Sequence, residues 1–164
     1  MNIFVLDECP NTSAEYMCDQ HIPKMLTESA QMMASALLEN GVSISKMPLT
    51  KKGTPYKGGY KHHPCTKWVQ ETRCNYLWLA DHALRLWREH AIRFKSNHAC
   101  GIPVKMMYDL FHESSIPRGR RTSFVQAMPD EYKNPCTITA YRNFYRGEKV
   151  KFATWDKSKQ PWWW

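Results

Sequence analysis

Apolar residues recur every three or four positions along most of the chain, and strict alternation of apolar and polar residues is rare. A repeat of three to four residues matches the turn of an α-helix and gives the helix one apolar face. The pattern therefore predicts a mainly α, compact single-domain helical bundle. The expected helices cover residues 12–20, 22–39, 64–94, 104–112 and 137–155.

The stretch from residue 64 to residue 94 is expected to form the long central helix of this bundle. Pro64 can occupy its first turn, because the N–H group that proline lacks would have no partner there. Residues spaced by three or four positions should share one face of the helix. They are Trp68, Thr72, Tyr76, Leu79, Ala83, Leu86, His90 and Phe94.

Local signals set the boundaries near the start of the chain. Residues 2–6 are mostly apolar and predict a short N-terminal strand or an extended segment on the core. Thr12 and Glu15 form a capping-box pattern, which begins a helix. Pro23 fits the first turn of a second helix that begins near Ile22.

Two segments lack a helical repeat. Residues 41–63 contain four glycines and two prolines and predict a long loop, and loops of this length usually serve a function. Residues 156–164 form a tail that ends in three tryptophans. These rings should pack on the body, close a groove or meet a second subunit. We expect a homo-oligomer, most simply a dimer, with a ligand near the subunit boundary.

Length and composition favour one folded domain over residues 1–164, since a chain of 164 residues buries roughly 70% of its surface. No apolar run reaches the roughly 20 residues that cross a bilayer, so we expect a cytoplasmic protein without membrane contact. The six cysteines contain no C-x-x-C pair, which favours free thiols. The net charge of +8 favours an anionic partner.

The first candidate site lies on the helix of residues 22–39. His21, Lys24, Glu28 and Gln31 are spaced by three or four residues and should share one face. Such a stripe can hold a phosphate or a nucleobase, or perform acid–base chemistry. The alternative is a solvated helix face with an ordinary ion pair between Lys24 and Glu28.

The second candidate site surrounds the start of the helix at Pro64. Amide groups at a helix N-terminus attract anions, so a phosphate could bind beside Lys61, His62 and His63. Zinc is a weaker interpretation, because the histidines and cysteines nearby lack a familiar four-ligand spacing, and we expect no metal and no cofactor. Ligand contacts farther along the helix would come from Trp68, Arg73, Asn75 and Tyr76.

The third candidate site is a basic loop that contains Arg118, Arg120, Arg121, Thr122 and Phe124. Arginine binds phosphate oxygens through two parallel hydrogen bonds, and threonine adds a compact donor. Short basic runs are also common as flexible surface loops, which is the alternative. Phosphate-binding loops and nucleophile motifs of the common enzyme families are absent. The residues therefore favour binding of a phosphate-bearing nucleotide without a nucleophilic triad.

Several longer segments resemble a widespread family of small bacteriophage proteins. The resemblance covers residues 1–155 and rests on MNIFVLDECP, CDQHIPKMLTESAQM, the segment 61–65, the segment 71–79, FVQAMPDEYK and AYRNFY. Within that family the chain is similar to proteins that sequester a cyclic dinucleotide such as cyclic GMP-AMP and thereby inhibit CBASS antiviral defence. The resemblance implies binding without catalysis in a host cytoplasm. Pro23 departs from the family pattern and could shift Lys24 and Glu28 relative to His21.

Two other functions remain open from the residues. One is an enzyme that processes nucleotides or nucleic acid, such as a glycosylase, lyase or hydrolase, with His21 and Glu28 as the acid and base. The other is a DNA-binding accessory protein, whose affinity would fall steeply with salt. Turnover would distinguish the enzyme from both kinds of binding protein.

Overall fold

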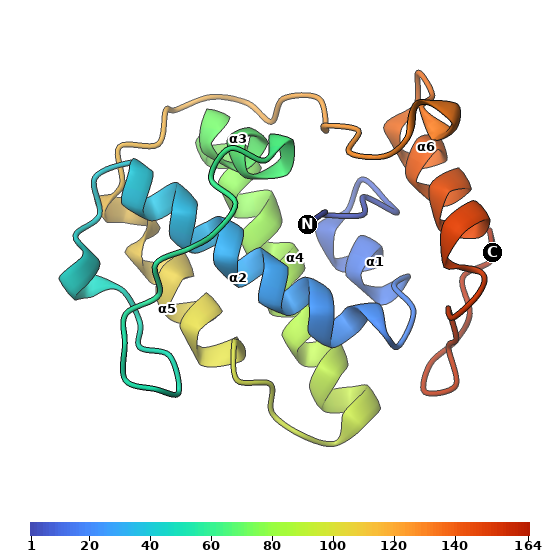
Figure 1. Cartoon of the computed structure of the whole chain (residues 1–164), viewed down its shortest axis with the longest axis horizontal. Helices are drawn as coiled ribbons and strands as arrows, with labels where there is room; N and C mark the ends of the chain where they lie inside the picture. Colours follow the sequence, from blue (N-terminus) through green and yellow to red (C-terminus); the bar gives the residue numbers. More distant parts are fainter.

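The computed structural model describes residues 1–164 and is mainly helical, as predicted (Figure 1). It contains no β-strand, and an isolated bridge between Leu49 and Pro55 is its only β-type pairing. None of the helices is long and apolar enough to cross a membrane. The α-helices are α1 (Pro10–Glu15), α2 (His21–Glu39), α3 (Pro64–Glu71), α4 (Arg73–Phe94), α5 (Gly101–Leu110) and α6 (Thr137–Phe144).

The two longest helices, α2 and α4, form the centre of the molecule. Helix α4 crosses behind α2 in Figure 1 and also packs against α1, α3 and α5. Both helices bury a long apolar face in one continuous core, and Leu37 and Leu79 are fully buried there. Helix α2 matches the predicted helix of residues 22–39 closely, and residues 41–63 form the expected loop apart from one short turn, Ile44–Lys46.

The single helix predicted over residues 64–94 is wrong, because Thr72 divides it into α3 and α4. Thr72 has extended backbone angles, and its hydroxyl accepts a hydrogen bond from the N–H group of Asn75 at 3.1 Å. The N–H group of Arg73 donates to the carbonyl of Pro117, which lies far away in the sequence, at 2.8 Å. Both contacts give a hydrogen-bond partner to an N–H group at the start of α4. In a continuous helix these N–H groups would instead bond to carbonyls of the preceding turn.

Replacing Thr72 with alanine is expected to lower the free energy of unfolding by about 1 kcal/mol, because a helix cap is lost. Urea denaturation followed by circular dichroism would measure this loss. Thr72→Ser keeps the capping hydroxyl and should stay close to wild type. Equal stability of the alanine and serine variants would contradict the capping role.

Helix α1 also differs from the prediction. It begins at Pro10 rather than Thr12 and ends at Glu15 rather than near residue 20. The capping-box interpretation of Thr12 is therefore wrong, since Cys9 is the N-cap. The early end has a tertiary cause: the carbonyl of Glu15 accepts a hydrogen bond from the guanidinium of Arg93, on α4, at 2.8 Å.

The remaining helix boundaries shift as well. Helix α5 begins three residues before the predicted Val104, and a 3-10 turn, Phe111–Glu113, follows it. The prediction of one helix over residues 137–155 is wrong in its second half. Helix α6 ends at Phe144 and continues as a π-helical turn, Tyr145–Lys149.

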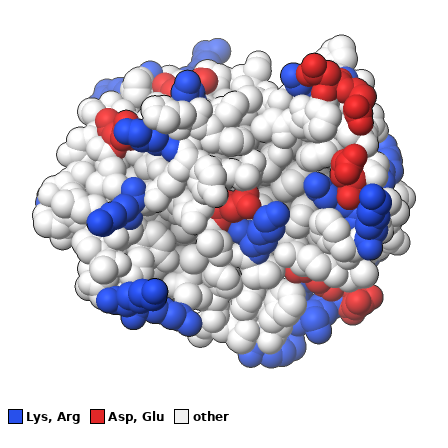
Figure 2. Space-filling model, viewed as in Figure 1, with Lys and Arg blue, Asp and Glu red and all other residues white.

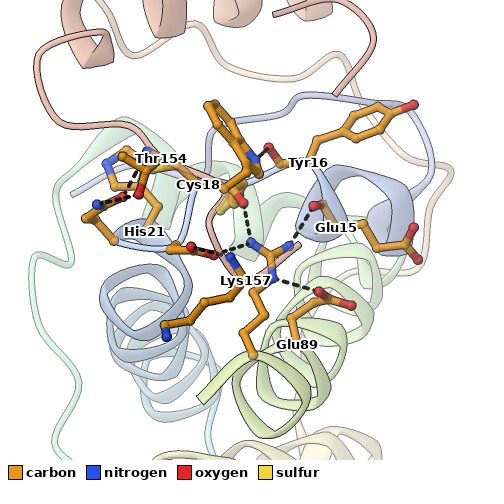
Figure 3. A network of polar contacts seen from close by, with 12 residues as sticks. Glu15, Tyr16, Cys18, His21, Glu89, Thr154 and Lys157 are labelled. Carbon is orange, nitrogen blue, oxygen red and sulfur yellow. Dashed lines mark hydrogen bonds and ion pairs between the residues drawn. The ribbon is translucent and has the colours of Figure 1, made fainter. Parts of the chain in front are cut away.

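Arg93 organises a buried polar network that joins α1, α4 and the segment before α2 (Figure 3). Its side chain is 1% exposed, and it pairs with Glu89 at 2.9 Å and with Asp19 at 3.2 Å. It also donates to the carbonyl of Met17 at 2.8 Å. Asp19 in turn accepts the N–H group of Lys157 at 3.1 Å, so the network also fixes the C-terminal tail.

The C-terminal tail folds back onto the body. Trp163 is buried, and the ring of Trp164 lies 4.7 Å from that of Trp155. Trp162 is 78% exposed and lies against the guanidinium of Arg142. All three terminal rings thus have partners within the chain, and the dimer stays a prediction.

Candidate active site

A surface pocket of about 360 Å³ opens over the first half of α2. Helix α2 contributes four polar side chains, because residues spaced by three, four or seven positions share one face. The chain start and the long loop supply the remaining two. The lining residues are Met1, Lys24, Thr27, Glu28, Gln31 and Tyr60.

Glu28 is the central polar group of this pocket. Its side chain is 16% exposed, and its carboxylate lies 3.9 Å from the terminal amine of Met1 and 4.0 Å from the ammonium of Lys24. It also accepts the N–H group of Asn2 at 2.9 Å. A carboxylate shielded from water beside two amines can both accept and return a proton.

The chain start is held against α2 by its own buried side chains. The side-chain amide of Asn2 donates to the carbonyl of Ala127 at 2.7 Å, and its Oδ1 accepts the N–H groups of Ile3 and Phe4. Phe4 has a φ of 53°, which a side chain other than glycine seldom adopts. The predicted N-terminal segment thus forms no strand and turns sharply at Phe4, and the contacts of Asn2 hold the amine near Glu28.

Met1 itself is packed rather than loose. Its side chain is 1% exposed, and its Sδ accepts a hydrogen bond from the hydroxyl of Thr66, on α3, at 3.5 Å. Only the amine end of the residue therefore borders the pocket. A packed side chain limits the positions that the amine can take.

His63 caps α3 close to the same amine. Its Nδ1 accepts the N–H group of Cys65 at 3.2 Å. Burial lowers the pKa of His63, and the positive terminal amine lowers it further, although Glu28 acts in the opposite direction. A neutral imidazole is therefore favoured beside the amine.

Comparison with known families decides what kind of protein carries this pocket. Residues 1–101 match the family described as pyrimidine dimer DNA glycosylase. The matched region is more than half of the chain and includes every residue that lines the pocket. The chain belongs to this family. No curated protein and no solved structure matches it.

This membership corrects the function expected from the resemblance to sequestering phage proteins. The similarity to cyclic-dinucleotide binders that inhibit CBASS defence is wrong, because the matched family consists of DNA glycosylases. Membership instead favours the alternative of a nucleic-acid-processing enzyme. The partner of this glycosylase family is DNA rather than a free nucleotide.

The structure separates the residues of the first candidate site. Lys24, Glu28 and Gln31 line the pocket, and Pro23 leaves α2 continuous from His21 onward. His21 is buried, stacked on Phe4 at 4.8 Å, and its Nδ1 lies 2.6 Å from the hydroxyl of Tyr145. Burial lowers the pKa of His21 to about 3, with a further contribution from Lys24. His21 is thus a neutral core residue outside the pocket.

The second candidate site is also divided. Lys61 is exposed and lies 3.6 Å from Glu39, and His62 is exposed beside it. Trp68 and Tyr76, in contrast, are buried in the core. No group of three or more histidine, cysteine, aspartate or glutamate side chains is placed to hold a metal ion.

Asn75 and Arg73 serve the junction after Thr72 rather than the pocket. The side chain of Asn75 donates to Thr122 Oγ1 at 2.7 Å and accepts the N–H group of the same threonine at 2.9 Å. Arg73 donates to the carbonyl of Ile116 at 3.2 Å. These contacts tie the basic loop to the start of α4.

The basic loop lies at another pocket, of about 300 Å³, which does not include Glu28. Arg121 pairs with Glu8 and covers the ring of Phe124, which is itself buried. Arg118 and Arg120 are exposed and have no ion-pair partner. The basic loop therefore does not share the pocket of Lys24, Glu28 and Gln31.

Sequence reasoning missed the terminal amine altogether. The available signal was the apolar run at residues 2–6, because a buried segment at the start of a chain carries its amine into the structure. The apolar run does not indicate that Glu28 is the partner of the amine. Glu28 was found as part of a helical stripe, whereas its contact with Met1 depends on tertiary packing.

Proposed function

We propose that this protein is a DNA glycosylase that excises the base of a pyrimidine dimer, with the terminal amine of Met1 as nucleophile and Glu28 as the acid–base group. The observation that carries the proposal is the 3.9 Å approach of that amine to a shielded carboxylate at an open pocket. Family membership supplies the substrate class.

The reaction needs an amine, a carboxylate and water. The neutral amine attacks C1′ of the deoxyribose, and the electrons of the broken glycosidic bond leave with N1 of the pyrimidine. Water protonates this base, which stays bonded to the other pyrimidine of the dimer through the cyclobutane ring. Glu28 then takes a proton from the new C–N centre and returns it to the ring oxygen O4′ as the sugar opens to a Schiff base. Hydrolysis of the Schiff base releases the amine.

A terminal amine suits this task better than a lysine. As a class, terminal amines lose their proton roughly two pH units below lysine side chains, so more of the nucleophilic form is present near neutral pH. Lys24 and Lys149 are the competing amines near α2. Burial lowers the pKa of Lys149, with an opposing contribution from Glu148, but Lys149 does not line the pocket that holds Glu28.

Charge supports binding of DNA by its backbone. Figure 2 shows basic side chains spread over the viewed face rather than gathered in one patch, with an acidic group against a basic one near its centre. Lys24 is 61% exposed at the pocket. Scattered lysines and arginines position a duplex by phosphate contacts that do not depend on base sequence.

Borohydride trapping tests the proposal, because it reduces a Schiff base to a stable covalent bond. The protein is incubated with a duplex that contains one cyclobutane thymine dimer, and the adduct is digested and located by mass spectrometry. We expect it on the peptide that begins with Met1. The mechanism requires a free amine on Met1, which the intact mass of the purified protein checks.

An undamaged duplex is the control and should give no adduct. An adduct on Lys24 or Lys149 would overturn the assignment of the nucleophile. Absence of both adduct and cleavage of the glycosidic bond in the damaged duplex would overturn the proposed function.

A further inference from the structure

We infer that Tyr60 stacks on a base of the substrate DNA beside the lesion and holds the damaged nucleotide at the amine, an inference that rests on the proposed function. Tyr60 lines the same pocket as Met1 and Glu28. It would be a positioning and specificity-determining residue that takes no part in bond making or breaking.

The exposure of Tyr60 distinguishes it from every other tyrosine in the protein. Its side chain is 67% exposed, whereas the other seven tyrosines are buried or half-buried. Its ring forms no stacking contact with another aromatic residue and no contact with a cation. The exposed ring therefore has no aromatic or cationic partner within the chain, at a pocket that receives DNA under the proposed function.

The backbone around Tyr60 is fixed rather than loose. Gly58 has a φ of 72°, and a Cβ atom there would lie 2.6 Å from the backbone nitrogen of Ser35, so the loop contacts α2 where only glycine fits. The N–H group of Gly59 donates to Ser35 Oγ at 2.9 Å, and this hydroxyl donates to the carbonyl of Gly59 at 3.0 Å. These contacts anchor the loop one turn beyond Gln31.

Tyr60 itself has a φ of 54°, which is unfavourable for a residue with a side chain. Its carbonyl accepts the N–H group of His63 at 2.8 Å, so the loop is held on its far side as well. Strained residues of this kind persist where the surrounding structure holds them, and they concentrate at functional sites. The anchored loop keeps an exposed ring at the pocket rim.

The chemistry of the proposed reaction calls for such a ring. The amine can reach C1′ only if the nucleotide leaves its normal place in the stack, and a damaged base is displaced most easily. An aromatic side chain that stacks on a neighbouring base replaces the lost contacts and accepts any base. Lys57 and Lys61 are exposed neighbours of Tyr60 in the sequence and suit contacts with DNA phosphates, where Lys61 would exchange its 3.6 Å pair with Glu39 for a phosphate.

The test compares Tyr60→Ala and Tyr60→Phe on two duplexes, one with a thymine dimer and one with an abasic site, which has no base to displace. For the dimer, Tyr60→Ala should lower kcat/KM by roughly 5- to 140-fold, the range that corresponds to losing one base stack. Tyr60→Phe should stay close to wild type, because the ring remains. Trapping on the abasic duplex should not change in either variant.

A second readout reports stacking directly. A 2-aminopurine placed beside the dimer should lose fluorescence when wild-type protein or Tyr60→Phe binds, and should stay bright with Tyr60→Ala. The matched control is Leu49→Ala, which truncates an exposed side chain of the same loop outside the pocket. It should match wild type in every assay.

The outcomes separate this inference from the proposed function. If borohydride traps no adduct of the wild-type protein on either duplex, the proposed function fails. If wild type is active but Tyr60→Ala equals it on the dimer, or Tyr60→Phe is as impaired as Tyr60→Ala, the role of the ring is overturned. An equal loss of activity by Tyr60→Ala on the dimer and on the abasic duplex would also overturn it. Loss of stacking beside the lesion could not then explain the lower activity.

Discussion

Replacing Glu28 with glutamine is expected to lower the single-turnover rate of base removal by about 10²- to 10⁴-fold, the usual contribution of a general acid–base group. Glutamine has nearly the same shape, and its side-chain oxygen can still accept the N–H group of Asn2 that Glu28 binds at 2.9 Å. It cannot take a proton from the amine of Met1. The chemical step should therefore fail while the chain start stays in place.

Three measurements check this result together. Quenched-flow or manual sampling gives the single-turnover rate, fluorescence anisotropy gives the affinity for dimer-containing DNA, and thermal unfolding gives Tm. Affinity and Tm should remain near the wild-type values. Glu113→Gln is the control, because Glu113 is an exposed glutamate outside the pocket that pairs with Lys46. A rate for Glu28→Gln equal to that of Glu113→Gln would remove Glu28 from the mechanism.

Replacing Arg93 with alanine is expected to lower the free energy of unfolding by about 3–5 kcal/mol, the usual cost of removing one partner from a buried ion pair. The side chain of Arg93 is 1% exposed and satisfies the carboxylates of Glu89 and Asp19. Its loss removes the guanidinium from both carboxylates, which keep only Arg85 at Glu89 and the N–H group of Lys157 at Asp19. It also leaves the carbonyls of Glu15 and Met17 without their side-chain donor.

Urea denaturation followed by circular dichroism measures this change. Arg88→Ala is the matched control on the same helix, because Arg88 is exposed and belongs to no ion pair. Its effect should stay within about 0.5 kcal/mol. If Arg93→Ala were no more destabilising than Arg88→Ala, the buried network would not contribute to stability as argued.

The sequence by itself determined the mainly helical architecture and much of the candidate pocket. Helix α2 was predicted within one residue, because its apolar repeat and its stop at Asn40 are local signals. The same local geometry placed Lys24, Glu28 and Gln31 on one face, since a helix brings residues three and four apart together. Residues 41–63 were recognised as a loop from their glycines and prolines.

Tertiary structure decided where several helices end. The break at Thr72 depends on the carbonyl of Pro117, and the end of α1 depends on Arg93. These partners lie more than 40 residues away in the chain. A local pattern reports which conformations a segment tolerates, whereas distant donors and acceptors select one of them.

Tertiary structure also decided which chemical groups meet. Local spacing supported each of the three candidate clusters. In the folded protein, however, His21 is buried in the core, and the basic loop lines a different pocket. The contact between Glu28 and the amine of Met1 arises because Asn2 is clamped by the carbonyl of Ala127. Residue spacing encodes neighbours within one helix, while neighbours between distant segments follow from how their buried faces fit together.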